Sequence, residues 1–163
     1  MATARTEGDA PGALLAEPPW LSRWVPVALW TAVIGTLSTG WFDGEGTGGF
    51  FLPILGALFP YLEPESLDHI HGLMRKFAHL AEFAILAGLV ARALARPERS
   101  SAALGWQTIA ICVLWAGLDE YHQSFVPTRV GAAQDVLLDT TGAGFGYLLY
   151  RWRRISSGRR SRA

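Results

Sequence analysis

The chain contains 163 residues, of which 50% are hydrophobic and 17% are charged. So few charges in so apolar a sequence exclude an ordinary soluble domain and indicate a single-domain membrane protein. The formal net charge is zero, yet six of the fourteen basic residues fall between Arg151 and Arg162, while residues 43–68 are acidic. This asymmetry is typical of membrane topology signals and does not indicate nucleic-acid binding.

Residues 1–19 are rich in Ala, Gly, Pro and acids, which predicts a disordered cytoplasmic tail. From about Trp24 to Phe42 an apolar segment has roughly the 20 residues needed to cross a bilayer, so we expect a first transmembrane helix there. A cleaved signal peptide is the alternative, because Arg23 precedes the segment and Ser38 and Gly40 are small enough for cleavage. The long acidic tail before the segment favours the transmembrane helix.

The next apolar segment, Phe50–Leu62, is interrupted by two prolines and has only about 13 residues, too few to span a bilayer. We therefore expect a re-entrant or interfacial segment. A second transmembrane helix should begin within Pro64–Asp68, with Ser66 as a candidate N-cap, and continue to Leu94.

Two further spans are expected over Ala102–Tyr121 and Ala132–Tyr150. Basic residues cluster at Arg92–Arg99 and in the C-terminal tail, which places both termini in the cytoplasm by the positive-inside rule. The sequence thus predicts an all-α, multi-pass plasma-membrane protein. Its fold would be a bundle of four transmembrane helices with a re-entrant or interfacial segment after the first. The transmembrane domain would occupy residues 20–152, followed by a basic cytoplasmic tail, residues 153–163.

Polar side chains interrupt these apolar segments, and ionisable groups at such depth are costly unless they serve a function. Counting about 1.5 Å per helical residue from the cytoplasmic arginines places Glu82 about 15 Å up, near the midplane, and His79 at roughly 20 Å. Asp139 lies at about 18 Å on the fourth span. Three helices therefore bring polar groups to the outer half of the bilayer. The candidate site residues are Lys76, His79, Glu82, Asp119, Glu120, Gln123, Arg129, Asp135 and Asp139.

The spacing of these residues places them on shared helix faces. Asp119 lies four residues before Gln123, so both side chains share one side of the third span. On the fourth span, Gly142 and Gly146 continue the face of Asp139. Small residues at this spacing allow another helix to approach closely.

The candidate set holds five acids against Lys76 and Arg129, which leaves about three uncompensated negative charges when His79 is neutral. Such a cluster should hold protons or bind a cation, so a divalent cation is the one cofactor candidate. Alternatively, the polar groups only hold the helices together, although interhelical hydrogen bonds are weak in membranes. Arg129 could bind a phosphate or carboxylate, or it could pair with Asp135.

The four histidines divide into two groups. His79, in the second span, could carry a proton, bind a metal or be a buried hydrogen-bonded imidazole. His69, His71 and His122 lie at the expected outer boundary, where we expect solvated side chains.

Together these residues resemble the VanZ-like membrane protein family, named for an accessory protein of resistance to the glycopeptide teicoplanin. The resemblance rests on two blocks, RKFAHLAEFAILAGL and DEYHQSFVPTRVGAAQDVLLDTTGAGFG. Phe83 stands where the family usually has a tyrosine, and Asp139 where it usually has an asparagine. The resemblance implies membrane location and a link to the cell envelope, and it implies no reaction or cofactor. The matching positions are Lys76, His79, Glu82, Phe83, Asp119, Glu120, Gln123, Pro127, Arg129, Asp135, Gly142 and Gly146.

The first hypothesis is a non-enzymatic protein in the lipid bilayer whose outward polar pocket binds a lipid, a cell-wall precursor or the antibiotic. Arg129 and Lys76 would contact anionic groups of that ligand. The alternative is an intramembrane hydrolase or transferase that acts on a lipid-linked substrate, with His79 and an acid such as Glu82 or Asp119 as acid and base and a divalent cation held by carboxylates. A small proton-coupled transporter ranks last, since the sequence shows no inverted repeat.

Overall fold

The computed structural model describes residues 19–39, 44–125 and 133–160, and these ranges contain helices and no strand. The all-α class predicted from the sequence is confirmed for this part of the chain. The helices are α1 (Pro19–Leu37), α2 (Gly44–Leu58), α3 (Pro64–Leu94), α4 (Ser101–Gln123) and α5 (Ala133–Arg160).

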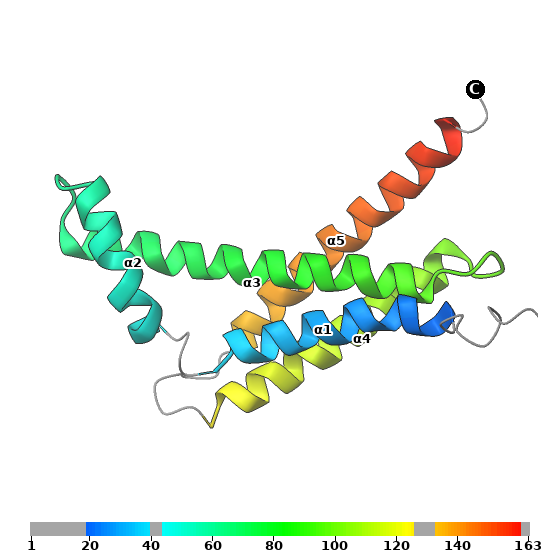
Figure 1. The fold of residues 1–163 in the computed structure, drawn as a ribbon, viewed down its shortest axis with the longest axis horizontal. Coiled ribbons are helices and arrows are strands. Elements are labelled where there is room, and N and C mark those ends of the chain that lie inside the picture. Colours follow the sequence, from blue (N-terminus) through cyan, green and yellow to red (C-terminus); the bar gives the residue numbers. More distant parts are fainter. Residues whose placement is uncertain (1–18, 40–43, 126–132, 161–163) are drawn as a thin grey trace, which may run out of the picture.

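The long helix α3 is the centre of the fold, and each of the other four helices packs against it (Figure 1). Its buried face carries Phe83, Leu86, Ala87 and Val90, none of which has exposed surface. This spacing of three and four residues forms one continuous apolar stripe on a helix. α1 and α4 run along α3, and α5 crosses it, so residues of four helices meet near the middle of α3.

Among the described glycines, those at the crossing of α3 and α5 lie closest to the backbone of a neighbouring helix. A Cβ atom on Gly142 would lie 2.3 Å from the carbonyl oxygen of Leu80, and one on Gly146 would lie 2.0 Å from that of Ala84. No side chain fits at these distances from backbone atoms. The prediction that these two glycines allow another helix to approach closely is confirmed.

Hydrogen bonds fix the position of α1 beside α3. The Trp30 indole Nε1 donates to the backbone carbonyl of Glu82 at 2.9 Å. Near the other end of α1, the Arg92 guanidinium donates to the carbonyls of Ser22 and Arg23 at 3.3 and 3.5 Å. The two helices are therefore joined both at the middle of α3 and at its C-terminal end.

The start and end of α3 and the start of α4 follow from local chemistry. Glu63, not Ser66, is the N-cap residue of α3, because Pro64 occupies the first helical position, where its missing N–H costs nothing. At the other end, the Arg99 guanidinium donates to the Leu94 carbonyl at 2.7 Å. Ser100 caps α4 by accepting from the Ala103 backbone N–H at 3.2 Å.

Two helices among the described residues, α3 and α4, are long and apolar enough to cross a membrane. They correspond to the second and third expected spans. The first and fourth expected spans also form helices, α1 and α5. Neither α1 nor α5 is apolar enough over a sufficient length to count as a candidate span. α1 is less apolar because of polar residues near its start, such as Arg23. α5 is less apolar because it contains Asp135, Asp139 and the terminal arginines.

The segment after α1 is helical, and its apolar part, Gly48–Leu58, is too short to span a bilayer. α2 packs on the N-terminal part of α3. Its Phe51 ring stacks on His71 with ring centroids 6.2 Å apart. The side chain of His71 is buried here, so the expectation of a solvated histidine was wrong at this position. His69 and His122 are exposed, as expected.

Candidate functional site

Two buried polar groups meet across the α3–α5 contact. His79 of α3 and Asp139 of α5 lie with Nδ1 and Oδ1 3.4 Å apart, and their side chains are only 18% and 4% exposed. Asp139 lies one turn before Gly142, so the close approach of the two helices brings its carboxylate to the imidazole. A protonated His79 would form an ion pair with Asp139.

The contact between these two atoms is an ionic one without the geometry of a hydrogen bond, and neither atom has a further partner in the described part of the chain. His79 Nδ1 and Asp139 Oδ1 are buried and have no hydrogen-bond partner among the described residues. The great majority of buried polar atoms in proteins are hydrogen-bonded, and an unpaired one costs about 1–3 kcal/mol. A water, an ion or a polar ligand atom would satisfy both groups.

A second buried group lies at the C-terminal end of α4. Asp119 Oδ2 accepts a hydrogen bond from the Ser38 hydroxyl at 2.8 Å and one from Gln123 Nε2 at 2.6 Å. All three side chains are buried. The sequence predicted the Asp119–Gln123 pair from its spacing, and the structure confirms that both side chains share one face of α4.

The two groups lie close enough to interact electrostatically, so we treat them as one cluster. Asp139 interacts with Asp119 as well as with Asp135, and His79 interacts with Glu82 and Asp135. We call Ser38, His79, Asp119, Gln123 and Asp139 the polar cluster. It draws residues from α3, α4 and α5, so the predicted convergence of polar side chains from three helices is present, with Ser38 added from the turn that follows α1.

The remaining candidate residues lie around this cluster or outside the described residues. Glu82, Glu120 and Asp135 are half-buried. Lys76 is exposed and lines an open pocket with Glu65, Asp68 and His69 nearer the start of α3. Arg129 and Pro127 lie outside the described residues.

Ser38 is the cluster residue that the sequence analysis missed as a site residue. It follows the last turn of α1, 81 residues before Asp119. The sequence analysis considered it only as a small residue for signal-peptide cleavage. A hydroxyl at the end of an apolar helix was the one signal available. Trp115 was also overlooked, and its buried indole Nε1 has no hydrogen-bond partner among the described residues.

The cation expected from the excess of acids finds no ready site in the described part of the chain. No group of three or more His, Cys, Asp or Glu side chains is arranged there to hold a metal ion. Within the polar cluster, Asp119 is already occupied by two neutral donors.

Comparison with known proteins gives one match. The family model described as VanZ/LLP1 matches residues 20–154 and so includes the polar cluster and both sequence blocks. No curated protein and no solved structure matches the chain.

Proposed function

The chain belongs to the VanZ/LLP1 family, as its motifs predicted, and from this premise we propose that it is a membrane protein that binds a lipid-linked or cell-envelope ligand without catalysing a reaction. The ligand would occupy an outward-facing polar pocket over the polar cluster. The link to glycopeptide resistance is part of this proposal. The family and the two apolar helices α3 and α4 indicate a membrane protein.

One observation carries the proposal: His79 Nδ1 and Asp139 Oδ1 are buried, close together and without hydrogen bonds among the described residues. Asp119 accepts hydrogen bonds from Ser38 and Gln123, whereas His79 and Asp139 contact each other at 3.4 Å without a further hydrogen-bond partner among the described residues. This pair therefore has capacity for an additional polar partner, which supports a bound molecule there.

We further propose that α1 and α5 cross the membrane with α3 and α4, which would place both termini in the cytoplasm. Apolar side chains on the outside of all four helices support this placement. Leu29 of α1 is 64% exposed, and Leu137 of α5 is 68% exposed. Such surface is costly in water and favourable in lipid. The polar cluster would then lie in the outer half of the bilayer.

Two basic residues would contact anionic groups of the ligand under this proposal. Lys76 lies on α3 one turn before His79 and is exposed. Arg129 would approach from the connection between α4 and α5, and its role rests on the sequence motif alone. A guanidinium can bind a phosphate or carboxylate through two parallel hydrogen bonds, which makes Arg129 the better candidate for specific contact.

Ligand-dependent thermal stability of the detergent-purified chain tests the proposal without assuming a reaction. Teicoplanin and a polyprenyl diphosphate serve as probes. A ligand present at 100 times its dissociation constant stabilises the folded state by about 2.7 kcal/mol, which raises the melting temperature. We expect a rise for at least one probe, and its loss in Asp139→Asn and Arg129→Ala.

The matched control is Glu98→Gln, which removes an exposed carboxylate from the α3–α4 connection. This variant should respond to the probe like the wild type. If no probe stabilises the wild type, or if all three variants respond equally, the polar cluster is not the binding site.

A second candidate function is an intramembrane hydrolase or transferase acting on a lipid-linked substrate. The pairing of His79 with Asp139 favours it, because a carboxylate beside an imidazole can orient the ring and stabilise its protonated form during general base catalysis. In this arrangement Asp139, rather than Glu82 or Asp119, would be the partner of His79. Product release from a lipid-linked phosphate, abolished by His79→Gln, would favour this candidate over simple binding.

A further inference from the structure

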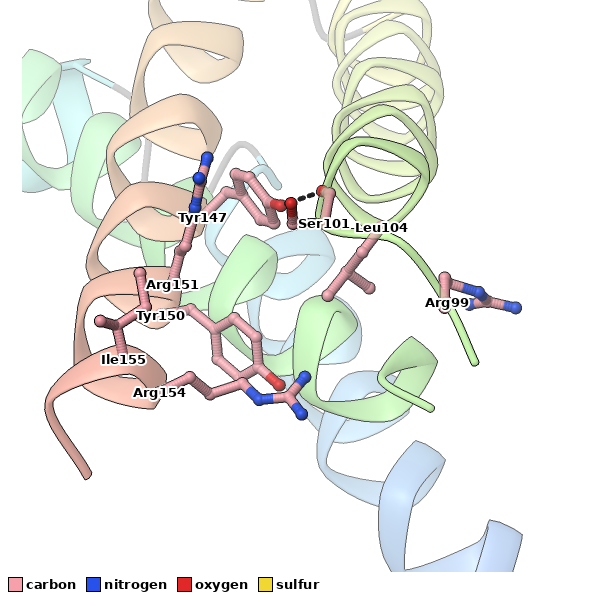
Figure 2. Close-up of a pocket in the computed structure, with 8 residues that line it drawn as sticks. All are labelled: Arg99, Ser101, Leu104, Tyr147, Tyr150, Arg151, Arg154 and Ile155. Carbon is pink, nitrogen blue, oxygen red and sulfur yellow. Dashed lines mark hydrogen bonds between the residues drawn. The ribbon is translucent and has the colours of Figure 1, made fainter. Parts of the chain in front are cut away.

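A second polar region lies at the opposite end of the molecule, where the start of α4 faces the C-terminal half of α5 (Figure 2). A pocket of about 250 Å³ opens there. Three arginines line it, and none of its eight lining residues is acidic. These residues are Arg99, Ser101, Leu104, Tyr147, Tyr150, Arg151, Arg154 and Ile155.

The wall of this basic pocket is fixed by one contact between α4 and α5. The Tyr147 hydroxyl donates a hydrogen bond to the Ser101 carbonyl. Gly105 makes this possible, because a Cβ atom there would lie 3.0 Å from the Tyr147 ring. This contact fixes the Tyr147 ring, one wall of the pocket, against the start of α4.

The donors in the basic pocket suit an oxyanion. Figure 2 shows the Tyr150 hydroxyl and the Arg154 guanidinium extending from α5 side by side, whereas the Arg151 guanidinium lies beside the Tyr147 ring and points away from them. Arg99 stands on the α4 side, held by its bond to the Leu94 carbonyl. Guanidinium and phenol groups are strong donors to phosphate oxygens, and no lining carboxylate competes for them.

An apolar groove continues from the basic pocket along α4. It shares Ser101, Tyr147 and Arg151 with the pocket and adds Ala102, Gly105, Trp106 and Ile109. Residues 101, 105 and 109 recur every four positions, so the groove follows one face of α4. It runs from Arg151 at the basic pocket toward Ile109. Trp106 is 75% exposed at its edge. Tryptophan is enriched where lipid headgroups meet acyl chains.

We propose that this site binds an anionic phospholipid, with its phosphate in the basic pocket and an acyl chain along the groove. Basic pockets between membrane helices on the cytoplasmic side hold anionic headgroups in this way. The site lies away from the polar cluster, and the inference rests on the proposed four-span topology, which places this end of α4 and α5 at the cytoplasmic membrane surface. It would hold the crossing of α4 and α5 in place from the membrane surface.

Native mass spectrometry of the full chain in neutral detergent tests this site with phosphatidylglycerol and with phosphatidylcholine of the same acyl chains. We expect phosphatidylglycerol to bind more tightly, and Arg151→Gln/Arg154→Gln to weaken its binding about tenfold or more. The control is Arg153→Gln, since Arg153 lies between the two on α5 but lines a different pocket. This variant should bind phosphatidylglycerol like the wild type.

A second variant examines the groove without changing charge. Ala102→Trp should fill the groove and weaken phosphatidylglycerol binding. The affinity of the basic pocket for inorganic phosphate should stay the same, because the variant leaves all three arginines in place. Equal binding of the two lipids, or equal weakening by Arg153→Gln, would overturn the proposal. If inorganic phosphate displaces phosphatidylglycerol at equal concentration, the pocket binds a free anion and the lipid proposal is wrong. Asp139→Asn should bind phosphatidylglycerol like the wild type. Failure of the ligand site at the polar cluster can therefore be told apart from failure of this lipid site.

Discussion

Asp119 and Asp139 show two different ways in which a carboxylate is accommodated inside this bundle. Asp119 receives two neutral donors, from Ser38 and Gln123, on one oxygen. Asp139 faces an imidazole at 3.4 Å without a completed bond among the described residues. The first arrangement is that of a structural group, and the second, an ionic contact with His79, is where the proposed ligand would bind.

This difference predicts a stability effect at Asp119. Asp119→Ala leaves the Ser38 hydroxyl and the Gln123 amide without their acceptor, and a buried donor without a partner costs about 1–3 kcal/mol. We expect the free energy of unfolding to fall by about 2 kcal/mol or more, measured by denaturant titration in mixed micelles. Asp119→Asn keeps one oxygen acceptor, so it should lose less. Equal losses in both variants would mean that the carboxylate charge, rather than its hydrogen bonds, stabilises the fold.

The sequence predicted individual site residues well where their partners lie on the same helix, and poorly where they do not. Asp119 and Gln123 could be paired from a spacing of four residues. Ser38 could not, because it reaches Asp119 only through the packing of α1. His71 was wrongly expected to be solvated, since nothing in the local sequence shows that Phe51 of α2 stacks on it.

At the level of helices, α3 and α5 cross at two glycines spaced by one turn. Gly142 faces the Leu80 carbonyl and Gly146 faces the Ala84 carbonyl, so the two contacts follow the same spacing on both helices. Membrane helices gain little from burying apolar surface against each other, and close van der Waals packing contributes more. The same crossing sets the distance between His79 and Asp139, which makes the glycines part of the site.

Alanine substitutions on α5 test this role with a control on the same helix. Gly146→Ala would place Cβ 2.0 Å from a backbone oxygen, so the helices must separate. We expect destabilisation of at least about 2 kcal/mol, in the range typical of overpacking. Gly144→Ala meets nothing within 4 Å and should be neutral or stabilising by up to about 1 kcal/mol, because alanine favours the helix. Similar melting temperatures for both variants would contradict the close crossing.

The helices were predictable because apolar segments of sufficient length must form helices in lipid. α3 and α4 fall close to the expected ranges. Helix ends were less predictable, since α5 continues to Arg160 while the expected span ended at Tyr150. The reason is that loss of apolar character marks the edge of a bilayer, whereas a helix can continue beyond it through good helix formers such as arginine.

At the scale of the whole molecule, α1, α3, α4 and α5 alternate in direction (Figure 1). The start of α1, the end of α3 and the start of α4 lie toward one end, as the contact between Arg92 and the first turns of α1 requires. Under the proposed four-span topology, the C-terminal parts of α3 and α5 and the α3–α4 connection lie on the cytoplasmic side, and they carry the arginines at positions 92, 96, 99, 151, 153 and 154. The positive-inside rule and the observed direction of the helices thus agree with each other.

Cysteine labelling distinguishes four spans from two. If only α3 and α4 crossed, with the α3–α4 connection in the cytoplasm, then α1 and α5 would both remain on the outer side. Ser157 of α5 would then lie on the same side as Tyr61, whereas with four spans it lies on the cytoplasmic side. Both residues are exposed, so cysteines at these positions should react wherever the reagent reaches them.

We expect an impermeant maleimide to label Tyr61→Cys in intact cells and to label Ser157→Cys only after permeabilisation. The single native cysteine, Cys112, is buried and can be replaced by alanine to remove any background. Glu98→Cys, in the α3–α4 connection, should be protected under either topology and so controls for cell integrity. Labelling of Ser157→Cys from outside would leave α3 and α4 as the only spans. That result would contradict the fold as well as the topology, because the start of α1 contacts Arg92 at the end of α3 and Tyr147 of α5 bonds to Ser101 at the start of α4.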